Sequence, residues 1–307
     1  MELLHFLADL RNGVLDVFFS TITHLGEETF FIVLGLIFFW CVNKREGYYM
    51  LSIGFIGTIL NQFLKLWFRI PRPWVKDPDF KPIESAIAEA TGYSFPSGHT
   101  QSSVGVFGGL ARWNKNKILR IICIAICVLV PFSRLYLGVH TLLDVGVSIV
   151  IALVLIFGLY PIVHKACDNE NIMRVLLGAM VLLSAGYLLF VSLYKFPSDV
   201  DIENLNNGTK NAYKMFGCTL GIFISHEIDI RFINFETKAT VSGQVLKLLI
   251  GVIPLLIIKE GLRVPLSMIF SGYSADFVRY FLIVIFAGCV WPLTFKWFSR
   301  LEFKKHK

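Results

Sequence analysis

The stretch LLDVGVSIVIALVLIFGLYPIV, residues 142–163, decides the fold of this chain. It runs for 22 residues with a single charged side chain, Asp144, close to its start. A helix of about 20 apolar residues crosses the roughly 30 Å hydrocarbon layer of a bilayer. The stretch therefore predicts a transmembrane helix, and it leaves Asp144 near one membrane surface.

The whole chain has the composition of a membrane protein. Of its 307 residues, 55% are hydrophobic and 17% are charged, and the mean hydropathy is +0.65. Soluble domains carry about 25% charged residues. Eight further apolar runs predict membrane-spanning helices at residues 29–42, 48–68, 99–112, 118–132, 172–194, 212–225, 241–258 and 277–298. We expect an all-α fold, a polytopic transmembrane helix bundle that forms one membrane domain over residues 1–307.

Three smaller features complete this prediction. Residues 1–27 are amphipathic and predict a helix at the membrane interface or a short buried helix; their acidic start predicts no cleavable signal peptide. The run 99–112 is rich in Gly and Ser, which favours tight packing inside a bundle. The six cysteines lie in or beside apolar runs without a CxxC pair, so we expect buried thiols and no zinc site.

The basic residues predict the orientation of the spans. They cluster between the first and second spans (44–45), between the third and fourth (112–120), and after the last (304–307). With nine spans these clusters share one side, which the positive-inside rule makes cytoplasmic. Residues 69–98 and 133–141 then lie on the extracytoplasmic side. Topology accounts for most of the net charge of +7, so we expect no nucleic-acid partner.

Three polar clusters interrupt the apolar pattern on the extracytoplasmic side. KLWFRIPRP (65–73) ends the second span, FPSGHT (95–100) begins the third, and SRLYLGVHTLLD (133–144) leads into the fifth. Each has a purely structural interpretation, because basic residues reach headgroups, Pro-Ser-Gly begins helices and His–Asp pairs form at one-turn spacing. Their common side and complementary chemistry favour a shared catalytic site instead.

The clusters supply what phosphoryl transfer needs. Its transition state spreads negative charge over the phosphoryl oxygens, so catalysis depends on positioning and on cations. Lys65, Arg72 and Arg134 provide the cations, and guanidinium groups bind phosphate through paired hydrogen bonds. The backbone N–H groups of Ser97 and Gly98, at a helix start, offer an anion cradle.

Two histidines and an aspartate provide the remaining chemistry. His140 and Asp144 are one helical turn apart, so the carboxylate can hold one ring nitrogen protonated and leave the other as a nucleophile. His99 is then available to protonate the leaving oxygen.

The ordered set of motifs resembles the type 2 phosphatidic acid phosphatase superfamily, which also includes vanadium-dependent haloperoxidases and glucose-6-phosphatase. Its motifs are Lys, six residues, Arg-Pro; Pro-Ser-Gly-His; and Ser-Arg, five residues, His, three residues, Asp. All positions are matched here, by Lys65 with Arg72-Pro73, by Pro96-Ser97-Gly98-His99, and by Ser133-Arg134 with His140 and Asp144.

The resemblance covers about residues 47–163 and implies a role for each motif residue. The phosphate-binding residues would be Lys65, Arg72, Ser97, Gly98 and Arg134. His140 would form a phosphohistidine, oriented by Asp144, while His99 would act as acid and then as base for water. It also implies a six-helix phosphatase core at about 28–195, followed by about three additional transmembrane helices in 196–307. That layout is similar to glucose-6-phosphatase and the sphingosine-phosphate phosphatases.

We therefore expect an integral membrane phosphatase that hydrolyses a lipid phosphate monoester or diphosphate. The choice of a lipid rests on the position of the clusters near the headgroup plane. It also rests on Trp74, Phe80, Tyr93 and Phe95, aromatic residues that favour the interface. A sugar-phosphate phosphatase similar to glucose-6-phosphatase is the main alternative, and a lipid carrier or flippase on the same fold is another.

No cofactor and no metal are expected for this chemistry. Two aspartate pairs, Asp77 with Asp79 and Asp199 with Asp201, are conceivable metal ligands, but solvated acids are common in such loops. The expected partners are a lipid phosphate substrate and the bilayer itself. The sequence assigns no oligomeric state.

Overall fold

The structure is a computed structural model that describes residues 1–301, and these residues form helices and loops without strands. The helices of the first half are α1 (Glu2–Asp9), α2 (Gly13–Thr23), η1 (His24–Gly26), α3 (Glu28–Ile37), η2 (Phe38–Val42), α4 (Lys44–Phe68), α5 (Pro73–Lys76), α6 (Glu84–Ile87), α7 (Gly98–Trp113) and α8 (Lys117–Tyr136). The later ones are α9 (Leu142–Cys167), α10 (Glu170–Leu193), α11 (Ile202–Ile228), η3 (Asp229–Ile233), α12 (Val241–Leu256), η4 (Ile257–Gly261), α13 (Arg263–Ile269), α14 (Ser274–Ile285), η5 (Phe286–Val290), η6 (Trp291–Thr294) and α15 (Phe295–Ser299). Lys304, Lys305 and Lys307 of the last basic cluster lie outside the described residues.

The predicted all-α fold is confirmed, and a helix stands at each of the nine predicted spans. Within residues 1–301, six helical segments are long and apolar enough to cross a membrane, and a bent pair formed by 13–26 and 28–42 would make a seventh. Two predicted spans fall short of that standard. Helix α7 has only 16 residues, and α11 begins with the polar sequence IENLNNGTKNAYK, which lowers its hydropathy.

The chain divides into two compact units. The first contains residues 1–33, 52–161 and 194–208 and holds all three motifs. The second contains residues 34–51 and 162–193 and the described chain from Thr209 onward. Trp40 is fully buried in the second unit and donates its indole N–H to the Ala287 carbonyl at 2.9 Å. Lys44 there pairs with Asp229 and lies 3.9 Å from the centre of the Phe235 ring.

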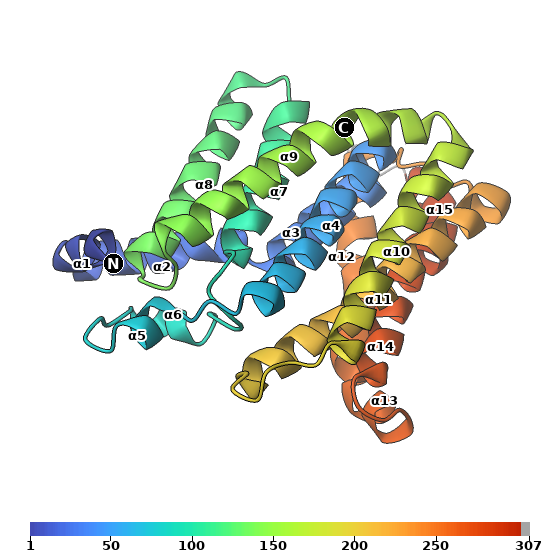
Figure 1. The fold of residues 1–307 in the computed structure, drawn as a ribbon. Coiled ribbons are helices and arrows are strands. Elements are labelled where there is room, and N and C mark those ends of the chain that lie inside the picture. Colours follow the sequence, from blue (N-terminus) through green and yellow to red (C-terminus); the bar gives the residue numbers. More distant parts are fainter. Residues whose placement is uncertain (302–307) are drawn as a thin grey trace. The chain divides into compact units, whose positions relative to one another are not determined.

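Helices α7 and α8 form an antiparallel hairpin in the first unit (Figure 1). Asn116 caps α8 by accepting hydrogen bonds from the N–H groups of Ile118 and Leu119. Arg120 reaches back to the carbonyls of Ala111 and Asn114 and so ties the two helices together. The hairpin returns the chain to the end of the unit where α7 begins.

Glycines let α7 pack closely between its neighbours, as its Gly and Ser content predicts. A Cβ added at Gly105 would lie 2.9 Å from Ile53 of α4, and one at Gly108 would lie 2.7 Å from Ile156 of α9. Both distances are shorter than real Cβ contacts, so a larger residue at either position would force an isoleucine side chain of the neighbouring helix to shift. Helix α7 is consequently buried along most of its length.

The N-terminal helices cover the end of the first unit at which the motifs lie. Leu4 and Leu7 of α1 pack with Phe80, and Phe19 of α2 packs with Tyr136 at the end of α8. Their outer faces remain apolar and exposed, as expected of amphipathic helices. The packing overturns one expectation. Phe80, Tyr93 and Phe95 are buried in the protein and do not present an aromatic surface to the membrane interface.

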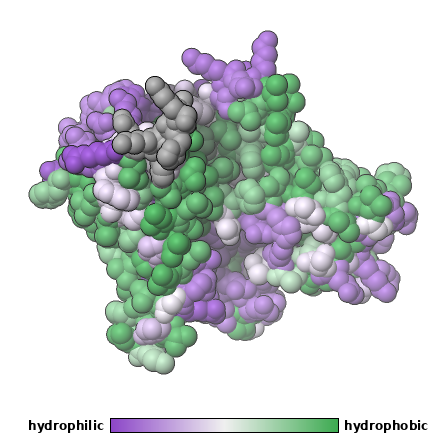
Figure 2. Space-filling model, turned by 180° about the vertical axis from the view of Figure 1, so that it is seen from behind, coloured by the Kyte–Doolittle hydropathy of each residue, from purple (hydrophilic) through white to green (hydrophobic). Residues whose placement is uncertain are grey.

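The outer surfaces of the long helices suit lipid. Ile118, Ile121 and Val128 of α8 are exposed at near-helical spacing, as are Val150 and Val154 of α9. Figure 2 shows hydrophobic residues over much of one face. All six cysteines are free thiols; Cys123, Cys218 and Cys289 are buried as predicted, and the other three are half-buried. These features are those of an integral, multi-pass membrane protein.

Candidate active site

Three helix ends bring the motif residues to one cavity of about 250 Å³. Helix α4 carries Lys65 in its last turn, α7 begins at Gly98, and α8 ends just beyond Arg134. The motif side chains and backbone that line the cavity are Lys65, Arg72, Gly98, His99, Arg134 and His140. Ser97 and Asp144 are buried and do not line it.

His140 lies between an acid and a guanidinium. Its Nδ1 is 3.6 Å from Oδ2 of Asp144, and its Nε2 is 3.0 Å from Nη1 of Arg72. Arginine can only donate, so Nε2 accepts this hydrogen bond and the ring proton belongs on Nδ1, facing the carboxylate. Burial, reinforced by the nearby positive charge of Arg72, lowers the pKa of His140 well below its ordinary value. The imidazole is therefore neutral, with the lone pair of Nε2 directed away from the acid.

Asp144 is fixed by hydrogen bonds that continue behind it. Its Oδ2 accepts from the Ser94 hydroxyl at 2.6 Å and from the Thr141 N–H at 2.7 Å. Thr141 returns a contact, because its Oγ1 accepts from the Asp144 N–H at 3.4 Å. Residues 141–144 thus form a reciprocal cap at the start of α9. The same local geometry that begins the helix orients the carboxylate toward His140.

The cationic side chains are anchored by backbone carbonyls of the segment 91–93. Arg72 donates to Thr91 and Gly92, and to Val139 on the opposite side. Lys65 donates to the carbonyl of Tyr93. Gly92 has φ +73°, a conformation that glycine adopts without strain, so it allows the turn that aims these carbonyls at the cations.

Arg134 is the phosphate-binding candidate with the most free donor capacity. It is only 1% exposed, and its Nη1 donates to the Thr23 hydroxyl at 2.7 Å. Its Nε has no hydrogen-bond partner within residues 1–301. A buried guanidinium that lines a cavity and keeps an unpaired N–H is suited to bind an anionic oxygen.

In the structure, one N–H group of the predicted anion cradle has another partner. The N–H of Ser97 donates to the backbone carbonyl of Asp144 at 3.2 Å, and the Ser97 hydroxyl caps α7 by accepting from the Thr100 N–H. Ser97 therefore joins the starts of α7 and α9 and does not face the cavity. Gly98 alone of this pair lines it. The helix start needs a capping serine whether or not a phosphate binds there.

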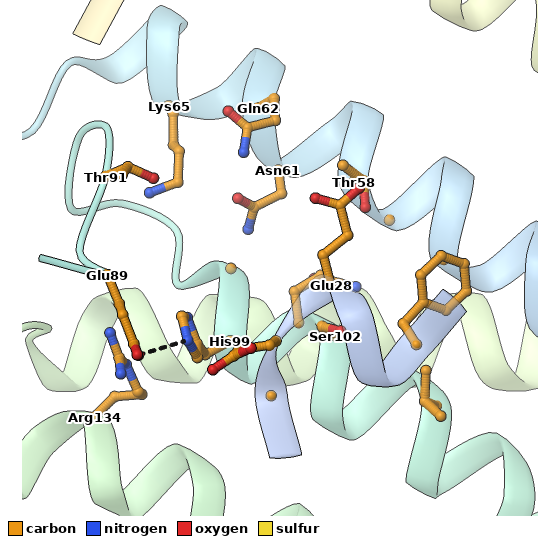
Figure 3. A pocket seen from close by; sticks show the side chains of 18 of the residues that line it. Glu28, Thr58, Asn61, Gln62, Lys65, Glu89, Thr91, His99, Ser102 and Arg134 are labelled. Atoms are coloured by element: carbon orange, nitrogen blue, oxygen red, sulfur yellow. Dashed lines mark ion pairs between the residues drawn. The ribbon is translucent and has the colours of Figure 1, made fainter. Parts of the chain in front are cut away.

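Glu89 is a site residue that sequence reasoning missed. It comes from the segment after α6, and its Oε2 lies 3.9 Å from Nε2 of His99 (Figure 3). Glu89 is close enough to orient the imidazole ring of His99, the candidate general acid. No motif marks Glu89, because it is brought in by the path of a loop. Ser94 and Thr23, which hold Asp144 and Arg134, carry no sequence signal either.

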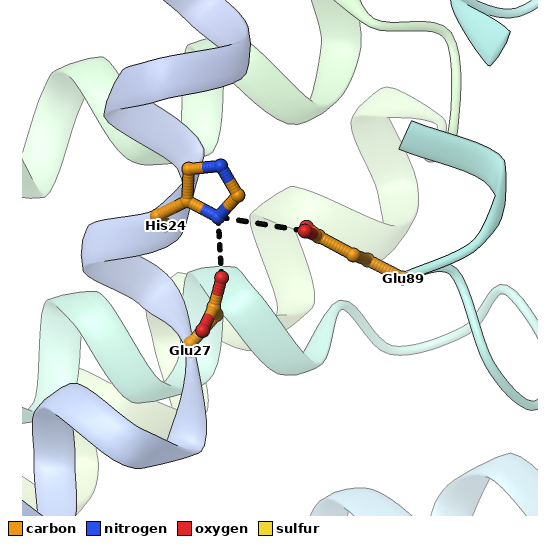
Figure 4. A group of neighbouring side chains, drawn as sticks. All are labelled: His24, Glu27 and Glu89. Atoms are coloured by element: carbon orange, nitrogen blue, oxygen red, sulfur yellow. Dashed lines mark hydrogen bonds and ion pairs between the residues drawn. The ribbon is translucent and has the colours of Figure 1, made fainter. Parts of the chain in front are cut away.

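His24, Glu27 and Glu89 form a group that could hold a metal ion, drawn in Figure 4. Glu27 contacts Nδ1 of His24, and Oε1 of Glu89 is 3.4 Å from the same nitrogen. Their potential ligand atoms all lie within 4.8 Å of one another. Neither of the two aspartate pairs forms such a group in the part of the chain that the structure describes.

Two protein-family profiles match the chain. The PAP2 superfamily profile matches residues 46–168, and the profile described as PAP2 superfamily phosphatase, transmembrane extension, matches residues 213–304. Phosphatidylglycerophosphatase B of Bacillus subtilis is 31% identical over 161 residues, which are 48% of this chain and 75% of that protein.

Two eukaryotic proteins are also similar. Sphingosine-1-phosphate phosphatase 1 of Rattus norvegicus is 30% identical over 54% of this chain and 39% of its own length. A probable sphingosine-1-phosphate phosphatase of Dictyostelium discoideum is 25% identical over 88% of this chain and 68% of its own. No solved structure matches the chain. The family profiles, the relatives and the apolar helices lead to one conclusion: the chain belongs to the PAP2 superfamily and is a multi-pass membrane phosphatase with that superfamily's transmembrane extension.

Proposed function

We propose that this protein hydrolyses a lipid phosphate monoester or diphosphate through a phosphohistidine on His140, without a metal ion. The observation that carries the proposal is the arrangement of His140 between Asp144 and Arg72. It leaves a neutral imidazole whose Nε2 lone pair lies in a cavity lined by cations. A neutral ring nitrogen with an available lone pair can attack the phosphorus atom as a nucleophile.

The reaction has two steps. In the first, Nε2 of His140 forms a bond to phosphorus, the bond from phosphorus to the leaving oxygen breaks, and protonated His99 gives its proton to that oxygen. Asp144 stabilises the positive charge that develops on the ring. In the second, His99 takes a proton from water, the water oxygen bonds to phosphorus, and the bond between phosphorus and Nε2 breaks. Inorganic phosphate leaves, and both histidines return to their starting states.

The cations stabilise the transferring phosphoryl group. Arg134 offers its unpaired Nε–H, and Lys65 and Arg72 add positive charge at the same cavity. Arg72 must rotate some of its donors from backbone carbonyls to phosphate oxygens, and this motion also releases Nε2 of His140. Three cations placed where the negative charge develops perform the role that Mg²⁺ has in other phosphotransfer sites.

Several observations favour a lipid as the substrate. The cavity lies where several helices begin or end, and the helices around it have apolar outer faces. A lipid can present its phosphate to such a site while its chains remain in the bilayer. The names of the similar proteins, phosphatidylglycerophosphatase and sphingosine-1-phosphate phosphatase, refer to lipid phosphates. The basic clusters at 44–45 and 112–120 support an extracytoplasmic active site.

The test is phosphate release by the purified protein in detergent. Lipid phosphates, a prenyl diphosphate and glucose 6-phosphate are compared by kcat/KM. We expect turnover of lipid phosphates and little of the sugar phosphate. Preference for glucose 6-phosphate would contradict the lipid assignment and leave the chemistry in place. Lipid transport that persists in His140→Ala, with no hydrolysis by the wild type, would identify a carrier instead.

A further inference from the structure

The cavity continues beyond the phosphate-binding groups along a polar wall. Thr58, Asn61 and Gln62 precede Lys65 on α4 by one or two turns, and Gln101 and Ser102 stand in the first turn and a half of α7. All five line the cavity that also holds His140. Figure 3 shows Thr58 of α4 beside Glu28, and Asn61 directed from α4 toward the side of the cavity on which His99 lies. A wall of this polarity is unusual between helices that face lipid.

Gln101 and Asn61 are buried, and each has hydrogen-bonding atoms that no residue in 1–301 pairs. Gln101 is 5% exposed, and neither its Oε1 nor its Nε2 has a partner among the residues described. Asn61 is 2% exposed; its Nδ2 donates to the Pro96 carbonyl at 3.4 Å, whereas its Oδ1 has no partner in residues 1–301. Buried amides are nearly always paired, because an unpaired one has lost its bonds to water without replacement. A bound ligand group that forms hydrogen bonds with the side-chain amides of Asn61 and Gln101 would explain why unpaired amides line the cavity.

The charges of the cavity indicate what that group is. Glu27, Glu28 and Glu89 line it as well, so the cavity has carboxylates in addition to the cations that serve the phosphate. Together with the Oδ1 of Asn61 and the Oε1 of Gln101, these are hydrogen-bond acceptors. They complement a donor, and a protonated amine would also offset the negative charge.

We propose that Asn61, Gln101 and Glu28 form a headgroup subsite. It binds a hydrogen-bond donor, a hydroxyl or an ammonium group, carried on the second or third carbon from the phosphoester oxygen. The subsite rests on the proposed lipid phosphatase function and narrows its substrate class. Lysophosphatidic acid and sphingoid phosphates carry such donors, whereas diacylated phosphatidic acid and alkyl and prenyl phosphates do not. A substrate without donors would leave both amides unpaired in the complex, and sites built to bind a donor discriminate strongly against its absence.

The first experiment compares three lipids on the wild-type protein by kcat/KM. Sphingosine 1-phosphate carries an ammonium and a hydroxyl, oleoyl lysophosphatidic acid carries a hydroxyl only, and oleyl phosphate carries neither. We expect one or both donor-bearing lipids to exceed oleyl phosphate by about tenfold or more. The better of the two identifies the donor. Equal values for all three would overturn the subsite while leaving the phosphatase function intact, whereas hydrolysis of none would refute both.

The second experiment removes the acceptors without changing volume. In Asn61→Leu and Gln101→Met, the ratio of kcat/KM for the preferred lipid to that for oleyl phosphate should fall about tenfold. The control is Ser103→Ala on α7, whose hydroxyl bonds to Thr100 within the helix and does not line the cavity; its ratio should equal that of the wild type. An unchanged ratio in both cavity variants would overturn the proposal.

Thermal unfolding distinguishes a binding role from a structural one. Gln101→Met removes two unpaired buried atoms, so its melting temperature in detergent without substrate should be at least that of the wild type. A lower melting temperature, with the same fractional loss of kcat/KM on all three lipids, would show that Gln101 supports the fold and would contradict the subsite.

Discussion

Nη1 of Arg72 lies 3.0 Å from Nε2 of His140, so the proposed nucleophile is held by a hydrogen bond from a proposed phosphate ligand. The bond assigns the ring proton to Nδ1 and keeps the lone pair of Nε2 aimed into the cavity. An arriving phosphate competes for the same guanidinium, because its oxygens are stronger acceptors than an imidazole. Substrate binding would therefore expose the nucleophile at the moment it is needed.

Because of this hydrogen bond, we expect substitution of Arg72 to reduce activity strongly. Arg72→Lys keeps the charge but loses the planar set of donors that reaches Thr91, Gly92, Val139 and His140. We expect kcat/KM to fall by roughly 10²–10³, the loss typical for a donor that stabilises transition-state charge. Steady-state kinetics on a lipid phosphate provide the measurement. Near-wild-type kinetics would mean that a point charge suffices.

Substitutions of His140 and Asp144 should reduce turnover to different extents. His140→Ala removes the attacking atom and should abolish turnover. Asp144→Asn keeps the shape but favours the wrong ring tautomer, and should cost on the order of 10²–10⁴ in kcat. His5→Ala, which removes a half-exposed histidine that does not line the cavity, serves as the matched control. Substantial hydrolysis by His140→Ala would refute the assigned nucleophile.

The protonation of His140 can be measured directly. Burial and the neighbouring cations lower its pKa well below the ordinary 6.5, so the ring binds a proton only at pH values below the usual histidine range. In ¹⁵N-histidine-labelled protein, the signal lost in His140→Ala should remain that of a neutral imidazole as the pH falls through about 6.5. Titration at or above 6.5 would contradict the structure's account of a neutral nucleophile.

Hydrolysis should not depend on a divalent ion. Lys65, Arg72 and Arg134 already supply the positive charge, so activity should persist in excess chelator, and vanadate, which mimics the five-coordinate phosphoryl group, should inhibit. Phosphate release before and after chelation is the measurement. If activity disappears and an added divalent ion restores it, His24→Ala tests whether the group of His24, Glu27 and Glu89 holds that ion.

Cysteine labelling at two exposed positions tests on which side of the membrane the active site lies. In a background without the six native cysteines, Asp79→Cys should react with a membrane-impermeant thiol reagent added outside intact cells, and Asn116→Cys should not. Asp79 lies on the side of the catalytic cavity, and Asn116 lies in the basic loop between α7 and α8. The reverse labelling pattern would place the active site in the cytoplasm.

The sequence predicts the helices well because membrane insertion demands long apolar runs, and each of the nine runs became a helix. It also predicts which helix ends meet, since the motif residues have complementary chemistry. Individual contacts within the site are harder to predict from the sequence. Ser97 was expected to present its N–H to an anion, but the start of α9 takes that N–H through the Asp144 carbonyl. A contact between residues 47 positions apart leaves no local pattern in the sequence.

Residues that enter the site from loops or as neutral amides could not be recognised. Glu89 reaches His99 only because the segment after α6 turns back over the cavity. Gln101 is an ordinary polar residue of a helix start until burial leaves its amide unpaired. For the aromatic residues of the loop, the sequence indicated a functional surface that the structure does not have. Phe80 and Phe95 match an interfacial composition, yet they pack inside the protein because α1 and the end of α4 cover them.

The most direct test of the account is to trap the intermediate. Protein mixed briefly with a lipid labelled with ³²P in its phosphate, then denatured and kept alkaline, should carry label on a peptide that contains His140. Mass spectrometry should place the added phosphoryl group on that residue, and the label should be released by acid, as a phosphorus–nitrogen bond requires. His140→Ala should carry none. Turnover without labelled protein, or label that persists in His140→Ala, would contradict the phosphohistidine mechanism.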